Sequence, residues 1–355
     1  MSMPEQDRSE ELRTQVESAL QAQQGLSIQA GGSKDFYGHQ CAGKRLDPRA
    51  HRGIVNYQPK ELVITLRAGT PLAEAEAVLA EQGQVLPFEP PHFADGATVG
   101  GMEACVLSGP ARAAAGSVRD YVLGVRIING RAEILHFGGE VMKNVAGYDV
   151  SRLMVGALGT LGVILETSFK VLPRPAAQQT RVLGLEPQQA LEQVNRMPAL
   201  NYPLTASFHD GERLYLRLAG TESAVQESGR RIGGELLDDA GFWNDVREQS
   251  HQWFQSDLAL WRLSVPSLSP WLELPGTQCF EWDGALRWLM SDQPAESIRS
   301  AVDRAGGHAT LFRRGDPASD VFHPLDPVMS KLQRSLKQAF DPSGLFNRGR
   351  MYREF

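Results

Sequence analysis

Residues 143–163, KNVAGYDVSRLMVGALGTLGV, join an apolar repeat to three glycines, Gly156, Gly159 and Gly162. The repeat has the spacing of one helix face: Val150, Leu153, Met154, Ala157 and Leu158. This spacing predicts an amphipathic helix packed on a core. Glycine weakens a helix, so the glycines need another role. A helix end followed by a strand explains Gly159 but leaves Gly162 unexplained.

Composition restricts the classes of function. A chain of 355 residues predicts about two domains. It carries 36 basic and 42 acidic residues and no basic block, which makes nucleic acid an unsuitable partner. The N-terminus is acidic and polar, and no apolar run reaches the roughly 18 residues of a membrane span. We therefore expect a cytoplasmic protein that docks on another component.

The sequence predicts no metal site. The three cysteines, Cys41, Cys105 and Cys279, lie far apart, whereas an iron-sulfur cluster or structural zinc needs about four ligands. The eight histidines form no HxH or HExxH pair. Each histidine is interpreted as a surface or core residue.

The chain divides near residues 172–180, LPRPAAQQT, where prolines and polar residues interrupt the pattern. In the first part, residues 61–69 read as a strand, and Thr70 is expected to cap a helix that ends before Gly83. QVLPF reads as a further strand. Asn129-Gly130 separates two β-rich runs and predicts a type I′ hairpin. This part mixes α and β without strict βαβ alternation.

In the second part, Asp210-Gly211 and Asp283-Gly284 each separate two β-rich runs, and helical segments follow. Residues 308–314, HATLFRR, add a strand. Hairpins with helices between them predict an antiparallel sheet covered on one face by helices. All six tryptophans lie between Trp243 and Trp288. They are interpreted either as a docking surface or as the core of this part.

Standard nucleotide motifs do not fit. No GxGxxG occurs, and residues 38–45, GHQCAGKR, have Arg45 where a P-loop needs Ser or Thr. Glycine clusters remain at residues 28–38, 97–109 and 156–164. Successive amides without side chains can form anion-binding nests, so a pyrophosphate could lie across several of these loops.

In their order, these clusters resemble the PCMH-type FAD-binding domain of vanillyl-alcohol oxidase-like flavoproteins. The motifs AGGSK, ATVGG, VRDYVLG, FGGEVMKNVAGYD and GTLGVI carry the resemblance over residues 26–173. HRGIVNY, PFEPPH, AGGHAT and LFNRGRMY extend it to the FAD-binding subunits of glycolate oxidase. It implies an α+β fold: a PCMH-type domain (1–175), a smaller α+β domain with an antiparallel sheet (176–335), and a segment (336–355) that returns to the first domain.

The resemblance also implies cofactor-binding residues. The first pyrophosphate loop would be Gly31, Gly32, Ser33 and Lys34. The second would be Thr98, Val99, Gly100 and Gly101, with Ser108 and Gly109. Pro91 and Gly116 would also lie near FAD, while Gly162 and Ile164 would face the polar edge of the flavin. Asn347 and Arg350 match the family's closing segment. Ala30 and Arg348 depart from the family, which usually has glycine and proline there.

By the same resemblance, FAD would bind non-covalently and accept hydride from a small 2-hydroxy acid such as glycolate. Electrons would pass to an iron-sulfur subunit, and a larger FAD-containing glycolate oxidase subunit would carry most substrate chemistry. The resemblance is also compatible with peripheral contact between this complex and the inner face of the membrane. No catalytic residue is identified, and His308 has no partner at metal-ligand spacing. The alternatives are a self-sufficient FAD-dependent dehydrogenase and a non-catalytic scaffold with a flavin-type fold.

Overall fold

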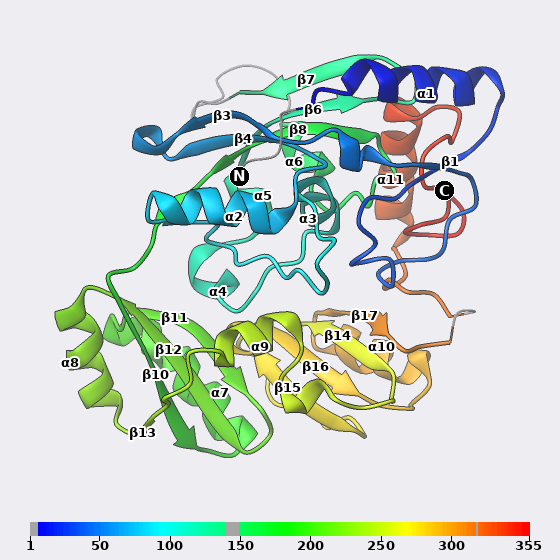
Figure 1. Ribbon diagram of the computed structural model, residues 1–355. Coiled ribbons are helices and arrows are strands. Elements are labelled where there is room, and N and C mark those ends of the chain that lie inside the picture. The colour runs from blue at the N-terminus through cyan, green and yellow to red at the C-terminus, as the bar shows by residue number, and fades with distance from the viewer. Residues whose placement is uncertain (1–5, 140–148, 317–318) are drawn as a thin grey trace.

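A computed structural model describes residues 6–139, 149–316 and 319–355 of the chain. Two antiparallel sheets lie in separate halves of the molecule, and helices and loops of the first half fill the space between them (Figure 1). Residues 140–148, which hold most of the FGGEVMKNVAGYD motif and the start of the predicted helix, lie outside the described residues.

The first half is built on a five-stranded sheet in the order β3-β4-β8-β6-β7. Its strands are β3 (Ile54–Gln58), β4 (Val63–Arg67), β6 (Val122–Ile128), β7 (Ile134–Gly138) and β8 (Val163–Lys170). Helices α2 (Leu72–Glu81) and α3 (Val99–Cys105) pack against it. Their buried side chains form one cluster with Ile64, Leu66 and Phe169 of the sheet. The apolar runs of the sequence thus become the strands and the core.

Shorter elements surround this sheet. Strand β1 (Leu26–Ile28) pairs in parallel with β2 (Lys44–Leu46), and β5 (Gln84–Val85) pairs with β9 (Leu172–Pro173). Beside them lie the helices α1 (Ser9–Gln21), α4 (Arg112–Ala115), α5 (Val118–Tyr121) and α6 (Ser151–Met154). The C-terminal helix α11 (Pro327–Phe340) also packs here, and Phe346 bridges to Leu26. The end of the chain therefore rejoins its beginning.

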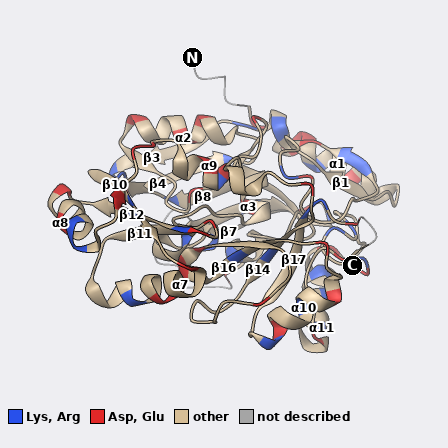
Figure 2. Ribbon diagram, turned by 90° about the horizontal axis from the view of Figure 1, so that it is seen from below, with Lys and Arg blue, Asp and Glu red and all other residues tan. Residues whose placement is uncertain are grey.

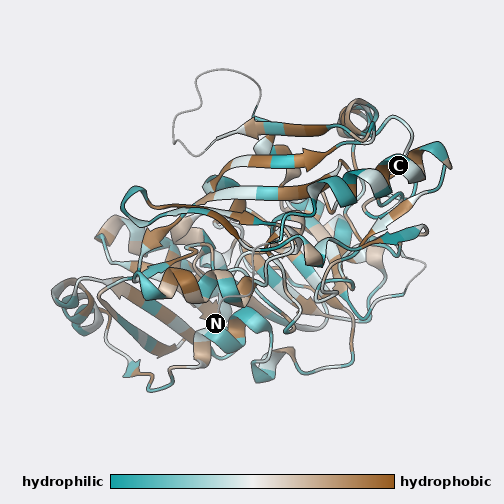
Figure 3. Ribbon diagram, turned by 45° about the horizontal axis from the view of Figure 1, so that its top comes forward, coloured by the Kyte–Doolittle hydropathy of each residue, from teal (hydrophilic) through white to brown (hydrophobic). Residues whose placement is uncertain are grey.

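The second half holds an eight-stranded antiparallel sheet in the order β13-β10-β12-β11-β15-β16-β14-β17. Its strands are β10 (Ala177–Gly184), β11 (Leu204–His209), β12 (Arg213–Gly220), β13 (Glu235–Leu236), β14 (Leu260–Ser264), β15 (Thr277–Glu281), β16 (Leu286–Met290) and β17 (His308–Arg313). The helices are α7 (Pro187–Arg196), α8 (Glu222–Ile232), α9 (Phe242–Glu248) and α10 (Ala295–Arg304). Figure 3 shows apolar residues concentrated on the strands, while Figure 2 shows acidic and basic residues side by side on α8.

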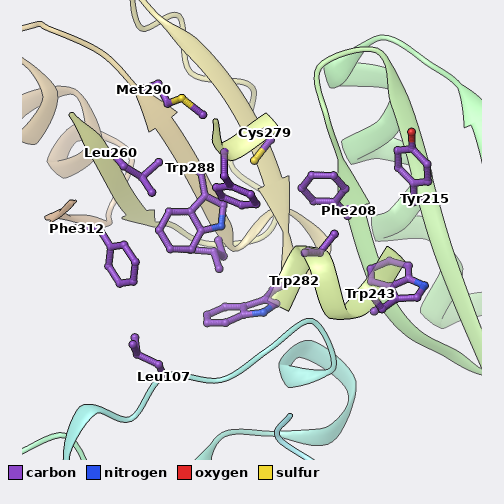
Figure 4. Close-up of a cluster of buried hydrophobic side chains, with 14 of the residues drawn as sticks. Leu107, Phe208, Tyr215, Trp243, Leu260, Cys279, Trp282, Trp288, Met290 and Phe312 are labelled. Carbon is purple, nitrogen blue, oxygen red and sulfur yellow. The ribbon is translucent and has the colours of Figure 1, made fainter. Parts of the chain in front are cut away.

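The two faces of this sheet have different partners. Helices α7, α8 and α10 cover the outer face, and the α9 side chains pack on the inner face. The inner face also meets Tyr37, Cys105, Leu107 and Leu158 of the first half in one buried cluster (Figure 4). Helices between the hairpins do cover one face, as the sequence predicts, and the other face is an interface between the halves.

Four tryptophans are part of this packing and are between 3% and 7% exposed: Trp243, Trp261, Trp282 and Trp288. The indole nitrogen of Trp282 donates to the carbonyl of Gly109 at 2.9 Å, which links the two halves. The interpretation of the tryptophans as core residues is confirmed for these four, and a docking surface built from them is excluded.

The predicted hairpins form, but one turn differs. Strands β6 and β7 pair with Ile128 opposite Ile134, so five residues connect them instead of two. Neither Asn129 nor Gly130 has positive φ, and a type I′ turn is therefore wrong. The Asn129 side chain instead accepts from the amides of Arg131 and Glu133, at 2.9 and 3.0 Å. Gly130 is needed because a Cβ there would lie 2.5 Å from Oδ1 of Asp341.

Two helix predictions also need correction. The helix expected up to Leu158 is a single turn, α6, and Leu153 of its predicted buried stripe is 37% exposed. The backbone leaves the helical region at Val155, which is extended, and Gly156 follows with φ of +84°. Thr70 does not cap α2, because its hydroxyl accepts from the amide of Gly53 at 2.9 Å. The amide of Leu72 is satisfied instead by the carbonyl of Ala97.

A buried ion pair anchors the C-terminal segment. Lys337 and Asp341 are 7% and 1% exposed, and their charged atoms lie 2.8 Å apart. Asp341 also accepts from the amides of Leu345 and Phe346, and Lys337 donates to the carbonyl of Thr160. Every charge in this cluster therefore has a partner, as buried charges require.

We expect Asp341→Ala to lower the free energy of unfolding by about 3–5 kcal/mol, because it leaves the Lys337 ammonium buried without its counter-ion. Denaturant titration followed by circular dichroism measures this. Glu227→Ala, which removes an exposed pair with Arg231 on α8, is the matched control and should change little. Equal changes in the free energy of unfolding of the two variants would contradict the role of Asp341 as the counter-ion of a buried lysine.

Candidate functional site

A cleft in the first half collects much of the predicted site. It holds about 870 Å³ of empty space, partly open to solvent, and lies between the loop after β1, the start of α3 and the turn before β8. Nine of the predicted residues line it: Gly31, Gly32, Ser33, Lys34, Thr98, Gly100, Gly101, Gly162 and Ile164. Asn347 and Arg350 of the C-terminal segment also line it.

The loop at residues 31–34 has free hydrogen-bond donors. Within the described part of the chain, none of its four consecutive backbone amides donates a hydrogen bond. Gly32 has φ of +74°, a conformation in which successive amides turn toward one side. The Lys34 ammonium is nearby, 7% exposed, and donates to the carbonyl of His92 at 3.2 Å. This combination suits an anion such as a pyrophosphate.

Gly31 is needed for a different reason. A Cβ on Gly31 would lie 1.5 Å from the carbonyl oxygen of Gly96, so the two backbones cross in direct contact. Any side chain here would separate them. Gly31 therefore positions the loop, while the amides that follow are available to a ligand.

The start of α3 leaves space for a ligand but offers few hydrogen-bond donors. The Thr98 hydroxyl accepts from the amide of Gly101 at 3.2 Å. The amides of Val99 and Gly100 already donate to the carbonyls of Thr70 and Ala68. Among the described residues, and leaving out the backbone of α3 itself, only the Thr98 hydroxyl lies within 4 Å of a Cβ built on Gly101, at 3.1 Å. A side chain at Gly101 would therefore press on Thr98 and extend into the cleft that Gly101 lines.

The turn before β8 forms the third wall. Leu158 and Gly159 have φ of +50° and +71°, and Asn347 holds the turn in place. Its amide group accepts from the amide of Ile28 at 2.7 Å and donates to the carbonyl of Leu158 at 2.6 Å. A Cβ on Gly162 would lie 2.7 Å from the carbonyl oxygen of Ile128. Packing against β6 thus accounts for Gly162 without any ligand.

Five predicted residues lie outside the cleft lining: Pro91, Val99, Ser108, Gly109 and Gly116. The Val99 side chain is fully buried in the core of the first half. Gly109 contacts the second half through Trp282. The Ser108 hydroxyl is buried and has no hydrogen-bond partner within the described residues.

Two cysteines of the cleft are not among the cofactor-binding residues predicted from the sequence, although Cys105, like His92, would be suspected if FAD were bound covalently. Cys41 and Cys105 both line the cleft, and burial raises the pKa of each thiol above its ordinary value. Cys105 follows ATVGG by four positions, a signal that could have placed it here. In the described ranges no three His, Cys, Asp or Glu side chains gather as metal ligands would. Over the same ranges, no helix has the length and apolar character needed to cross a membrane.

Comparison with known proteins relates this geometry to a family. Residues 6–138 match the model of a family described as "FAD binding domain". Glycolate oxidase subunit GlcE of Escherichia coli (strain K12) is 48% identical over 349 residues, which is 98% of both chains. The chain belongs to the GlcE family. Its first half therefore carries a FAD-binding domain, and the free amides at residues 31–34 fit such a cofactor.

Other relatives match shorter segments. D-2-hydroxyglutarate dehydrogenase of Xanthomonas citri pv. viticola is 30% identical over 142 residues, 39% of this chain and 29% of that protein. Among solved structures, alkyldihydroxyacetonephosphate synthase superposes with a TM-score of 0.66 at 14% identity, covering 95% of this chain and 75% of that one. This likeness supports the PCMH-type fold, an FAD domain followed by an α+β domain, that the sequence predicts for this GlcE-family chain.

One carboxyl group in α3 has an altered pKa. Glu103 is fully buried, and it shares a hydrogen bond through Oε2 with the hydroxyl of Thr167. Its Oε1 has no partner within the described residues. Burial raises the pKa of Glu103 to about 8, so the folded protein holds this carboxyl neutral at pH 7.

The stability of the protein should depend on pH through this group. Between about pH 4.5 and pH 8 the folded state keeps a proton that the unfolded chain releases, so stability falls as pH rises through this window. Glu103→Gln, which is neutral at every pH, should remove this loss. The melting temperature of the variant should gain on the wild type from about pH 5 to pH 8. A constant difference would show that Glu103 titrates normally.

Proposed function

We propose that this chain is the FAD-binding subunit of a multi-subunit glycolate oxidase, which oxidises glycolate to glyoxylate. The observation that carries the proposal is the similarity to the E. coli subunit over nearly the whole chain, including the C-terminal segment that closes the cleft. The partners are a larger FAD-containing subunit and an iron-sulfur subunit. In this proposal the complex works in the cytoplasm.

In this proposal the cofactor lies across the cleft. The amides of residues 31–34 bind its pyrophosphate, and Thr98 and Gly101 border the space that the rest of the molecule enters. FAD is held without a covalent bond. Cys41 and Cys105 line the cleft as protonated thiols, which are poor nucleophiles, and His92 pairs with Glu76 at 2.9 Å. When bound, FAD supplies an acceptor for the hydride of a 2-hydroxy acid.

Gly101→Val should abolish FAD retention while the protein stays folded, because its side chain meets little but the cleft. Purified wild type should be yellow and should release its flavin on acid precipitation. Gly184→Val, at an exposed glycine at the end of β10, is the control and should keep the flavin, because this glycine lacks positive φ and no atom of the described residues lies within 4 Å of a built Cβ. Full flavin absorbance in Gly101→Val would place the cofactor elsewhere.

Glycolate-dependent reduction of dichlorophenolindophenol tests the subunit assignment. The isolated chain should reduce the dye poorly or not at all, and activity should appear when the larger flavoprotein subunit and the iron-sulfur subunit are added. Comparable turnover by the isolated chain would replace the proposal with a self-sufficient dehydrogenase. A colourless protein that cannot be reconstituted with FAD would indicate a scaffold.

A further inference from the structure

Helix α11 presents a row of apolar side chains to solvent. Val328 and Leu332 lie one turn apart on the same face of the helix, and they are 75% and 51% exposed. Met329, beside them, is exposed as well. An open groove of about 1230 Å³ runs along the helix and is lined by side chains between Pro327 and Ala339. Apolar side chains that gather on an exposed surface mark interaction sites.

The opposite face of α11 supports the cofactor cleft. The Lys337 ammonium donates to the carbonyls of Thr160 and Phe346, at 2.7 and 2.8 Å. Thr160 lies in the turn before β8, which forms one wall of the cleft. A helix with its side chains is about 10–12 Å across, so a partner on the outer face of α11 lies about that far from this wall. Electron tunnelling slows steeply with distance, which makes this a favourable place for a redox partner.

The charge of this part of the chain restricts what can cover the apolar row. Residues 327–355 carry six basic and two acidic residues, although the whole chain has a net charge of -6. The side chains of Lys331 and Arg348 are exposed and make no hydrogen bond or ion pair within the described residues. Arg334 pairs with Glu354 at the surface. A complementary partner therefore presents carboxylates next to apolar side chains.

Two other occupants fit these observations less well. A symmetric dimer through α11 would bring the Lys331 and Arg334 side chains of two copies together, and these like charges would repel each other. An anionic lipid surface matches the charge but has no need to lie close to the cofactor cleft. A redox protein with an acidic surface matches both the charge and the position.

We propose that the outer face of α11 docks the iron-sulfur subunit, through a surface of that subunit that combines apolar side chains with carboxylates. The identity of the partner rests on the proposed function, whereas the docking surface rests on the exposed row of Val328, Met329 and Leu332 and on the basic residues around it. The partner is then held one helix away from the wall of the cleft.

Leu332→Asp places a carboxylate in the apolar row. It should weaken binding of the purified iron-sulfur subunit to the flavin-loaded chain at least about tenfold, the usual effect of removing a leucine that an interface buries. Biolayer interferometry measures this affinity. Leu268→Asp is the matched control, at a leucine of the second half that is 80% exposed, and it should bind like the wild type.

The charge is tested separately. Lys331→Glu should weaken the same binding and make it less sensitive to salt, because salt screens the attraction between exposed charges. Lys60→Glu, at an exposed lysine between β3 and β4, is the control for this change. All four variants should keep the flavin absorbance of the wild type. If Leu332→Asp melts early, Lys331→Glu decides the question, since its side chain has no partner to lose.

Unchanged affinity for the iron-sulfur subunit in both α11 variants overturns the docking surface and leaves the proposed function in place. If the α11 variants instead lose the larger flavoprotein subunit, self-association or binding to phosphatidylglycerol vesicles, the face belongs to that occupant and the proposed one is wrong. A wild-type chain that assembles with neither subunit rejects the proposed function and, with it, this partner.

Discussion

The hydrogen bonds of Asn347 hold together the walls of the cleft. One joins it to the amide of Ile28 at the end of β1, and the other joins it to the carbonyl of Leu158 in the turn before β8. These two segments are more than a hundred residues apart in the sequence, and neither pairs with the other directly in the described sheets. The Lys337–Asp341 pair fixes the segment that carries Asn347. The shape of the cofactor site therefore depends on the last part of the chain.

Sequence patterns predicted those parts of the fold that depend on residues close together in the sequence. Alternating apolar residues and the Asp-Gly pairs placed the hairpins around residues 210 and 283, because turn chemistry and strand burial act over a few residues. Thr70 and Asn129 show the limit of this reasoning. Each has the residue type expected for its predicted role, yet a distant partner or a longer loop gives its side chain a different hydrogen bond.

For the candidate site too, sequence patterns predicted one part and could not predict the rest. Glycine clusters marked the loops that line the cleft, since close backbone approach can be read from the absence of side chains. The sequence could not say what each glycine approaches. Gly31 meets Gly96 and Gly162 meets a strand, whereas Gly101 lines the cleft and a Cβ on it would meet the Thr98 hydroxyl.

The position of Asn347 near the end of the chain has a consequence for biosynthesis. A ribosome makes a protein from its N-terminus, and early segments can fold as they emerge. Here the five-stranded sheet is complete once residue 170 has been made, but the residue that ties β1 to the turn at Leu158 comes 177 positions later. The cleft is therefore finished only after the whole second half has been synthesised, so the cofactor binds to its completed site after both halves have been made.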